Sequence, residues 1–241
     1  MYIQPMTMAA IPQHRPARDP SRHAAPQVFD YLRERIIDLV LPPGTLIARL
    51  ELQQLFGFSS TPVRDALLKL QEESLVEIFP QHATVVSPID LKLARQAQFL
   101  RRSIEQEAVR TLAGEGARER GAIAARLRTV VALQRAVLAA GDFEAFHAAD
   151  REFHRLFFEA AGVPDLWVLV RRHSGHIDRI RRLHLPIPGK AEQVIADHEA
   201  IITGIAAGDV DVAQHALREH LSKSLAYSGD LRARWPDYFR D

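Results

Sequence analysis

The chain of 241 residues contains no cysteine, which excludes disulfide bonds and thiolate metal sites. Any metal ion would therefore be bound by histidine nitrogens and carboxylate oxygens, and the 11 histidines make their spacing informative. Long apolar runs are also missing, since no stretch approaches the length of a membrane-spanning helix. The N-terminal segment lacks the apolar core of a signal peptide. These absences favour a cytoplasmic protein without a membrane partner.

An excess of positive charge is missing too, because the formal net charge is +1. Residues 1–90 hold eight Lys and Arg against ten Asp and Glu. Bulk attraction to nucleic acid is therefore absent, and DNA binding would depend on where individual cations are placed. The hydrophobic content of 47% is sufficient for one large domain or for two smaller ones.

The first part of the chain shows a pattern of short helices. Apolar residues recur with helical spacing over 28–40, and the prolines at 42–43 end that helix because proline cannot continue it. A second short helix is expected over 49–56, and it ends at Gly57, where a left-handed backbone costs least. A third helix is expected over 60–73, with a serine as its N-cap and a proline in its first turn.

Two β-prone runs follow the third helix. The stretches "LVEIF" and "TVVSP" are separated by "PQHA", a pattern typical of a short hairpin. Three short helices followed by a hairpin form a winged helix-turn-helix, which presents its second helix, here 60–73, to the major groove of DNA by its N-terminal end. The sequence therefore predicts a DNA-binding domain over 27–88. A flexible arm over 1–26, rich in proline, alanine, histidine and arginine, is expected to precede it.

The remainder of the chain is dominated by helical pattern. The motif "AAGD" occurs at 139–142 and again at 206–209, and in each copy glycine ends one helix and aspartate caps the next. Such short connections predict an antiparallel bundle. The fold is expected to be mainly α, with the winged helix-turn-helix followed by an all-helical domain over 89–230 and a C-terminal tail over 231–241. About six helices are expected in the bundle, over 90–114, 117–139, 143–161, 165–184, 190–206 and 210–228.

The N-terminal end of the 60–73 helix carries several hydrogen-bond donors. Ser59, Ser60 and Thr61 add hydroxyl groups to the free backbone N–H groups and partial positive charge of a helix N-terminus, which suit a phosphate. Arg64 lies one turn inside the helix, where its guanidinium can reach a guanine edge or a phosphate. The alternative is that Arg64 is a surface arginine on a well-capped helix.

Four residues of the helical domain have the spacing of a metal site. Asp150 and His154 are four residues apart and share one face of a helix. His198 and His220 lie on two later helices, and ligands from three helices can converge inside a bundle. This set suits a divalent ion such as Zn²⁺, Ni²⁺ or Mn²⁺. The alternatives are that each histidine is an ordinary core or surface residue, or that the metal only stabilises a helical scaffold.

Three stretches carry a resemblance to a known family: "LPPG" at 41–44, "LQQLFGFSSTPVRDALLKLQEESLV" at 52–76, and the hairpin at 80–86. On these stretches the chain resembles the GntR family of bacterial transcriptional regulators. Its helical part resembles the FCD-type effector-binding domain of the FadR branch of that family. The resemblance implies that an Asp-x-x-x-His and two later histidines bind a metal, and the matching residues are Asp150, His154, His198 and His220.

The resemblance also implies that the metal lies in a pocket for a small organic-acid effector. Open coordination positions on the metal would accept the carboxylate of that effector. Arg102 matches a position often held by arginine in these domains, and its guanidinium would pair with the same carboxylate. The alternative for Arg102 is an exposed charge on a helix.

The chain departs from the family pattern at three positions of the DNA-binding domain. Ser60 stands where an arginine is usual within the turn, which removes a base contact. Arg49 stands where the short second helix usually opens with an acidic residue, and it supplies a cation nearby. Ala83, which follows His82, stands where the tip of the hairpin usually has glycine. The candidate residues for DNA contact are Arg49, Ser59, Ser60, Thr61, Arg64 and His82.

These observations predict an effector-responsive transcriptional regulator, a repressor, and not an enzyme. One winged helix contacts few base pairs, so we expect a homodimer on a palindromic double-stranded operator. Binding of a small carboxylate effector would favour a bundle geometry that changes the spacing of the two DNA-reading helices. The alternative is a metal-dependent enzyme that uses the aspartate and three histidines, although no acid or base with a clear catalytic role accompanies them.

Overall fold

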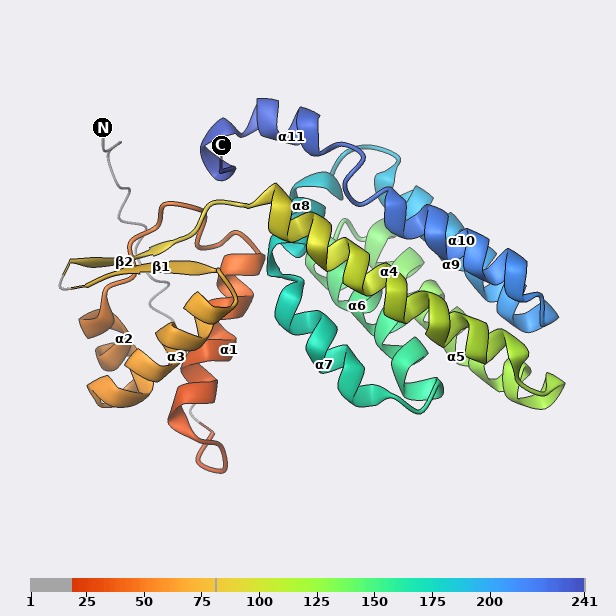
Figure 1. Ribbon diagram of the computed structural model, residues 1–241, viewed down its shortest axis with the longest axis horizontal. Helices are drawn as coiled ribbons and strands as arrows, with labels where there is room; N and C mark the ends of the chain where they lie inside the picture. Colours follow the sequence, from red (N-terminus) through yellow and green to blue (C-terminus); the bar gives the residue numbers. More distant parts are fainter. Residues whose placement is uncertain (1–18, 81, 241) are drawn as a thin grey trace. The chain divides into compact units, whose positions relative to one another are not determined.

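The computed structural model describes residues 19–80 and 82–240, and the chain divides into two compact units (Figure 1). One unit runs to Leu91 and includes the segment from Arg232 onward, and the other spans Lys92–Leu231. The greater part of the expected N-terminal arm lies outside the described residues. None of the described helices is long and apolar enough to span a membrane.

The first unit contains the winged helix-turn-helix that the sequence predicts. Its two strands pair antiparallel, from Val76 opposite Val86 to Phe79 opposite Ala83, so the expected hairpin is confirmed. Buried apolar side chains from all three helices and from the hairpin form its core. The elements are α1 (Ala24–Ile37), α2 (Arg49–Phe56), α3 (Ser60–Glu72), β1 (Val76–Phe79) and β2 (Ala83–Val86).

Local sequence signals account for most of these boundaries. The bounds of α2 are those expected, and Gly57 ends the helix with a left-handed φ of 66°. Ser59 precedes α3 with an extended backbone, as an N-cap residue does. The first helix differs from the expectation, because α1 begins at Ala24 and ends before Leu39, whose φ of 59° is incompatible with a continuing helix.

The C-terminal segment also belongs to the first unit. Phe239 pairs with Ile89 in a parallel bridge, and the Arg240 N–H donates to the Ile89 carbonyl over 2.9 Å. The Arg240 guanidinium forms an ion pair with Glu77 on β1. The chain enters this segment through α11 (Ser228–Arg234). The residues expected as a plain tail therefore contribute backbone hydrogen bonds to the winged-helix unit.

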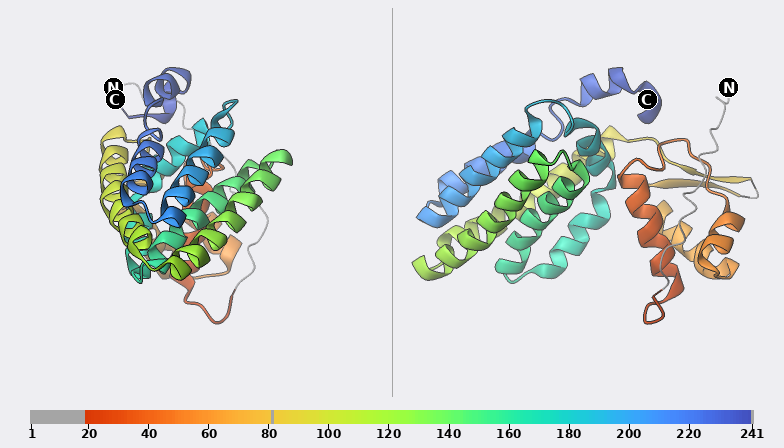
Figure 2. Two further views of the ribbon diagram at one scale, coloured as in Figure 1. Left: turned by 90° about the vertical axis from the view of Figure 1, so that its right-hand side faces the viewer. Right: turned by 180° about the vertical axis from the view of Figure 1, so that it is seen from behind.

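The second unit is a helical bundle, which confirms the predicted fold class. Its long helices lie side by side along a common direction (Figure 2). The core contains four buried phenylalanines of the third helix of the unit, Phe146, Phe153, Phe157 and Phe158. The elements are α4 (Leu91–Gly114), α5 (Ala117–Ala139), α6 (Phe143–Ala160), α7 (Pro164–His173), α8 (Gly175–His184), α9 (Lys190–Ala207) and α10 (Val210–Ser222).

The two "AAGD" motifs join helices as the sequence predicts. Gly141 and Gly208 have left-handed φ values of 70° and 75°. Asp142 accepts a hydrogen bond from the Ala145 N–H over 2.9 Å, and Asp209 accepts the equivalent bond over 3.0 Å. These minimal loops fold α5 back on α6 and α9 back on α10. Helix α10 is shorter than expected, since it ends at Ser222 and not at 228.

One helix expected from the sequence is broken in two. The stretch 165–184 forms α7 and α8, which meet at Ser174 and the glycine after it. The Ser174 hydroxyl donates a hydrogen bond over 2.7 Å to the carboxylate of Asp178, four residues further along the chain. Ser–Gly pairs are common places for a helix to bend, and local serine bonds compete with the helical ladder. The break gives α8 its own direction and places Arg181 against Asp150 of α6.

Candidate functional site

The N-terminal end of α3 presents a group of polar side chains to solvent. Ser59 occupies the N-cap position but its hydroxyl makes no capping hydrogen bond, so the hydroxyl stays free for another acceptor or donor. Ser60, Thr61 and Arg64 are likewise exposed. The opposite face of α3 anchors the helix in the core through Val63, Ala66, Leu67 and Leu70.

The two other candidates for DNA contact, Arg49 and His82, are also exposed. Arg49 is the first residue of α2, and His82 lies in the turn between β1 and β2. Within residues 19–80 and 82–240, neither of them forms an ion pair, and nor does Arg64. In Figure 1 this turn and the corner between α2 and α3 lie toward the same side of the winged-helix unit. The two arginines and the His82 side chain are therefore accessible to a polyanion.

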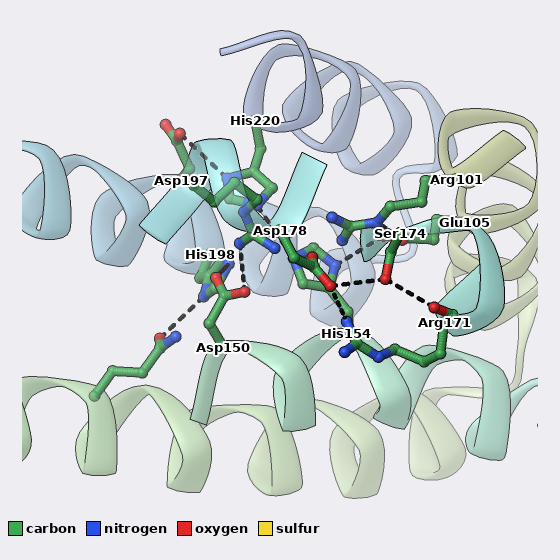
Figure 3. A network of polar contacts seen from close by, with 12 residues as sticks. Arg101, Glu105, Asp150, His154, Arg171, Ser174, Asp178, Asp197, His198 and His220 are labelled. Carbon is green, nitrogen blue, oxygen red and sulfur yellow. Dashed lines mark hydrogen bonds and ion pairs between the residues drawn. The ribbon is translucent and has the colours of Figure 1, made fainter. Parts of the chain in front are cut away.

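The structure brings the four predicted metal ligands together inside the second unit (Figure 3). Asp150 and His154 lie on α6, His198 on α9 and His220 on α10. One ligand atom of each lies within 4.8 Å of the ligand atoms of the other three, and all four residues are buried. The cluster is thus a compact donor set from three helices.

The Nδ1 atom of each imidazole in the cluster faces a side-chain oxygen, and this contact orients the ring. A carboxylate or amide oxygen accepts a hydrogen bond, so the facing Nδ1 must carry the proton and Nε2 must carry the lone pair. The three pairs are His154 with Glu105 of α4 at 2.7 Å, His198 with Gln134 of α5 at 3.0 Å, and His220 with Asp197 of α9 at 3.4 Å.

The remaining ligand atoms face one another in two pairs. His154 Nε2 lies 3.2 Å from His220 Nε2, and His198 Nε2 lies 3.7 Å from Asp150 Oδ1. The last two atoms are buried and have no hydrogen-bond partner. Four lone-pair donors at such distances repel one another unless a cation lies between them. The donor set therefore fits a divalent metal ion, with orienting oxygens of the kind found behind metal-binding histidines.

The pKa values of Asp150, His154 and His198 are shifted so that each stays in the protonation state that binds a metal ion. Burial lowers the pKa of His154 to about 4 and holds the pKa of His198 well below its ordinary value, so both imidazoles are neutral at pH 7. Burial alone would raise the pKa of Asp150, but the Arg181 guanidinium outweighs it and holds that pKa well below the usual range. The carboxylate therefore stays ionised in the protein interior.

Arg102, the expected partner of an effector carboxylate, lies on the exposed face of α4 and away from the buried side of that helix. The preceding residue, Arg101, is buried instead and donates to Glu105 over 2.7 Å. The charges of Arg101 and Glu105 compensate each other, and Arg101 holds the pKa of Glu105 down to about 2 against the effect of burial. The arginine in contact with the cluster itself is Arg181.

Comparison with known proteins decides the family. The model described as "Bacterial regulatory proteins, gntR family" matches residues 24–86, and the "FCD domain" model matches residues 96–223. The chain belongs to the GntR family. Its helical unit is an FCD domain, and it is a transcriptional regulator rather than an enzyme, as the sequence predicted.

Relatives of this GntR regulator match over most of their length. An uncharacterized HTH-type transcriptional regulator from an unstable DNA locus of Streptomyces ambofaciens is 34% identical over 213 residues, which cover 88% of each chain. The HTH-type transcriptional repressor RspR of Escherichia coli is 25% identical, and the match covers 92% of this chain and 96% of that one. The solved structure of E. coli McbR/YncC has the same fold, with a TM-score of 0.72 at 20% identity over 87% of this chain and 99% of that chain.

A pocket opens beside the cluster of Asp150, His154, His198 and His220 in the FCD domain. The space in it that water-sized molecules can occupy is about 50 Å³. Asp150 and His220 reach it from the cluster, and three cationic side chains, Arg181, Lys190 and Lys223, line it. The remaining lining side chains are Phe146, His147, His184, Leu185, Gln193, Val194, Asp197 and Ser224.

Sequence reasoning missed Glu105, Gln134 and Asp197, which orient the imidazoles, and also Arg101, although a signal for three of these four residues was present. Arg101 and Glu105 continue the helical stripe of Ala94 and Ala97 on α4, so they are charged residues at buried positions. Gln134 continues the buried stripe of α5 in the same way. Polar residues on an apolar stripe need partners, and here Glu105 and Gln134 find theirs in His154 and His198 of the Asp/His cluster.

Proposed function

We propose that this GntR regulator is a repressor that binds a palindromic operator as a homodimer and is controlled by a small organic acid bound near a divalent metal. The observation that supports it most is that four buried side chains able to bind a metal converge beside a pocket lined by cations. The same chain exposes the N-terminal end of α3. The repressor role is supported by the relative RspR, whose name describes a repressor.

Operator recognition would depend on the exposed end of α3. Arg64 would contact a guanine edge or a phosphate, and Ser59, Ser60 and Thr61 would donate to phosphate oxygens. Arg49 and His82 would add contacts on either side of this helix. A homodimer doubles these contacts and reads two half-sites, which compensates for the low positive charge of the domain.

The metal ion would be held by Asp150, His154, His198 and His220, and Zn²⁺, Ni²⁺ and Mn²⁺ are the candidates. When bound, it supplies a positive centre for the effector carboxylate. Glu105, Gln134 and Asp197 orient the three imidazoles. Arg181 neutralises Asp150 on the side away from the imidazoles and lines the pocket, so it replaces Arg102 as the arginine closest to the effector.

Selection of genomic DNA fragments by the purified full-length chain tests the proposal. We expect enrichment of one palindromic sequence, and binding to it should weaken steeply with salt because each phosphate contact releases about one counterion. Adding an organic acid that binds the metal-loaded chain should change operator affinity. Retention of fragments without sequence preference would contradict operator recognition, and operator affinity indifferent to every bound acid would contradict the control.

A further inference from the structure

Two histidines of the pocket lie outside the metal cluster, and each has a ring nitrogen without a hydrogen-bond partner among the described residues. His147 of α6 and His184 at the end of α8 are each 9% exposed. The Nε2 atom of each is buried and lacks a hydrogen-bond partner. Leaving a buried polar atom without a hydrogen bond is costly, so most buried polar groups are paired. Both residues line the pocket, so their side chains are candidates for contact with a bound molecule.

The pocket also holds one cation whose charge is not compensated. Arg181 is paired with Asp150, and Lys223 lies 2.7 Å from Asp197. Lys190 has no carboxylate partner among the described residues, because its ammonium faces only the Gln193 amide oxygen at 3.4 Å and the Tyr227 ring at 3.6 Å. Lys190 therefore attracts an anion that the protein itself does not provide.

Lys190 and His184 belong to the same end of the pocket. The ring of Tyr227 contacts both of them, with its centroid 4.6 Å from that of His184. Burial, followed by the nearby charges of Lys190 and Arg181, lowers the pKa of His184 to about 4. Burial and the charges of Arg181 and Arg182 likewise lower the pKa of His147 to about 3. The two imidazoles are neutral, so each can donate one N–H without adding charge.

We propose that Lys190 and His184 form a second anion subsite in the effector pocket, and that the effector is a small dicarboxylate. The inference rests on the proposed function, because the first carboxylate would bind at the metal cluster and Arg181. The second carboxylate would accept a hydrogen bond from the His184 imidazole and neutralise Lys190. A neutral hydroxyl group would satisfy an imidazole but would leave the charge of Lys190 uncompensated.

Succinate and butyrate separate the two subsites, because they have the same four-carbon length and differ only in the far carboxylate. Calorimetric titration of the metal-loaded full chain should show succinate binding about tenfold or more tightly than butyrate, as expected for charge-assisted hydrogen bonds. Lys190→Met should lower succinate affinity to the level of butyrate and leave butyrate affinity unchanged. Lys190→Arg should preserve the preference because it keeps the charge.

A matched pair of histidine variants completes the test. His184→Ala should reduce the preference for succinate, whereas His215→Ala, at an exposed position of α10, should not change it. Equal affinity for the two acids, binding of neither, or an equal loss of both in Lys190→Met would overturn the subsite. Metal content and operator binding, measured on the same preparation, distinguish this outcome from failure of the proposed function, since both remain intact if only the subsite is wrong.

Discussion

Replacing His198 with alanine should abolish the thermal stabilisation that a divalent ion gives to the full-length chain. His198 is fully buried and its Nε2 is one of the four converging donors, so the variant loses a ligand that no neighbouring residue can replace. An ion at one hundred times its Kd stabilises the native state by about 2.7 kcal/mol, or about 5–10 °C in a chain of this size. Differential scanning calorimetry with chelator and with Zn²⁺, Ni²⁺ or Mn²⁺ measures this difference.

The readout is the shift caused by the ion and not the melting temperature itself. Truncating a buried side chain leaves a cavity that lowers the stability of both forms. The loss of stability caused by the cavity therefore cancels when metal-loaded and chelated protein are compared. His215→Ala, on the exposed face of α10, is the control and should retain the full shift. An undiminished shift in His198→Ala would show that the ion binds elsewhere.

Replacing Arg64 with alanine should abolish specific operator binding without lowering stability. Each arginine contact to a base edge contributes about 1–3 kcal/mol of discrimination, and a symmetric dimer loses two of them. The side chain is exposed, lies off the buried face of α3 and forms no ion pair with a described residue. Gel-shift titration against the selected operator and thermal melting measure the two effects.

Lys69→Ala is the matched control for Arg64→Ala. Lys69 is an exposed cation on the same helix, but it lies in the last turn, away from the end that would enter the groove. We expect this variant to bind the operator nearly as well as the parent chain. If Arg64→Ala shifts the operator normally, or if Lys69→Ala is equally impaired, the N-terminal end of α3 is not the part that reads the operator.

Features set by neighbouring residues could be predicted from the sequence. The bounds of α2 follow from its apolar spacing and from Gly57, and the two "AAGD" loops follow from a glycine and a capping aspartate. The metal cluster was predictable in part for the same reason. Asp150 and His154 are one helical turn apart, so any helix places them on one face. Their convergence with His198 and His220 was an expectation from family resemblance that the geometry now supports.

Features set by packing between distant helices could not be predicted. Arg101 and Arg102 are adjacent, but a helix turns about 100° per residue, so one is buried and the other is exposed. Only the packing of α4 decides which of them faces inward. Arg181 reaches Asp150 because the chain bends at Ser174, and the pairing of Phe239 with Ile89 joins residues far apart in sequence. No local pattern marks such contacts.

The central claim is that the FCD domain of this chain holds a divalent metal at Asp150, His154, His198 and His220. Elemental analysis of the full-length protein, purified without added metal or chelator, tests it most directly. The account predicts about one divalent transition-metal ion per chain, as expected for a preformed set of buried donors. A metal content near zero, with no change in melting when Zn²⁺, Ni²⁺ or Mn²⁺ is added, would contradict it and would leave the cluster as a polar group that binds the effector directly.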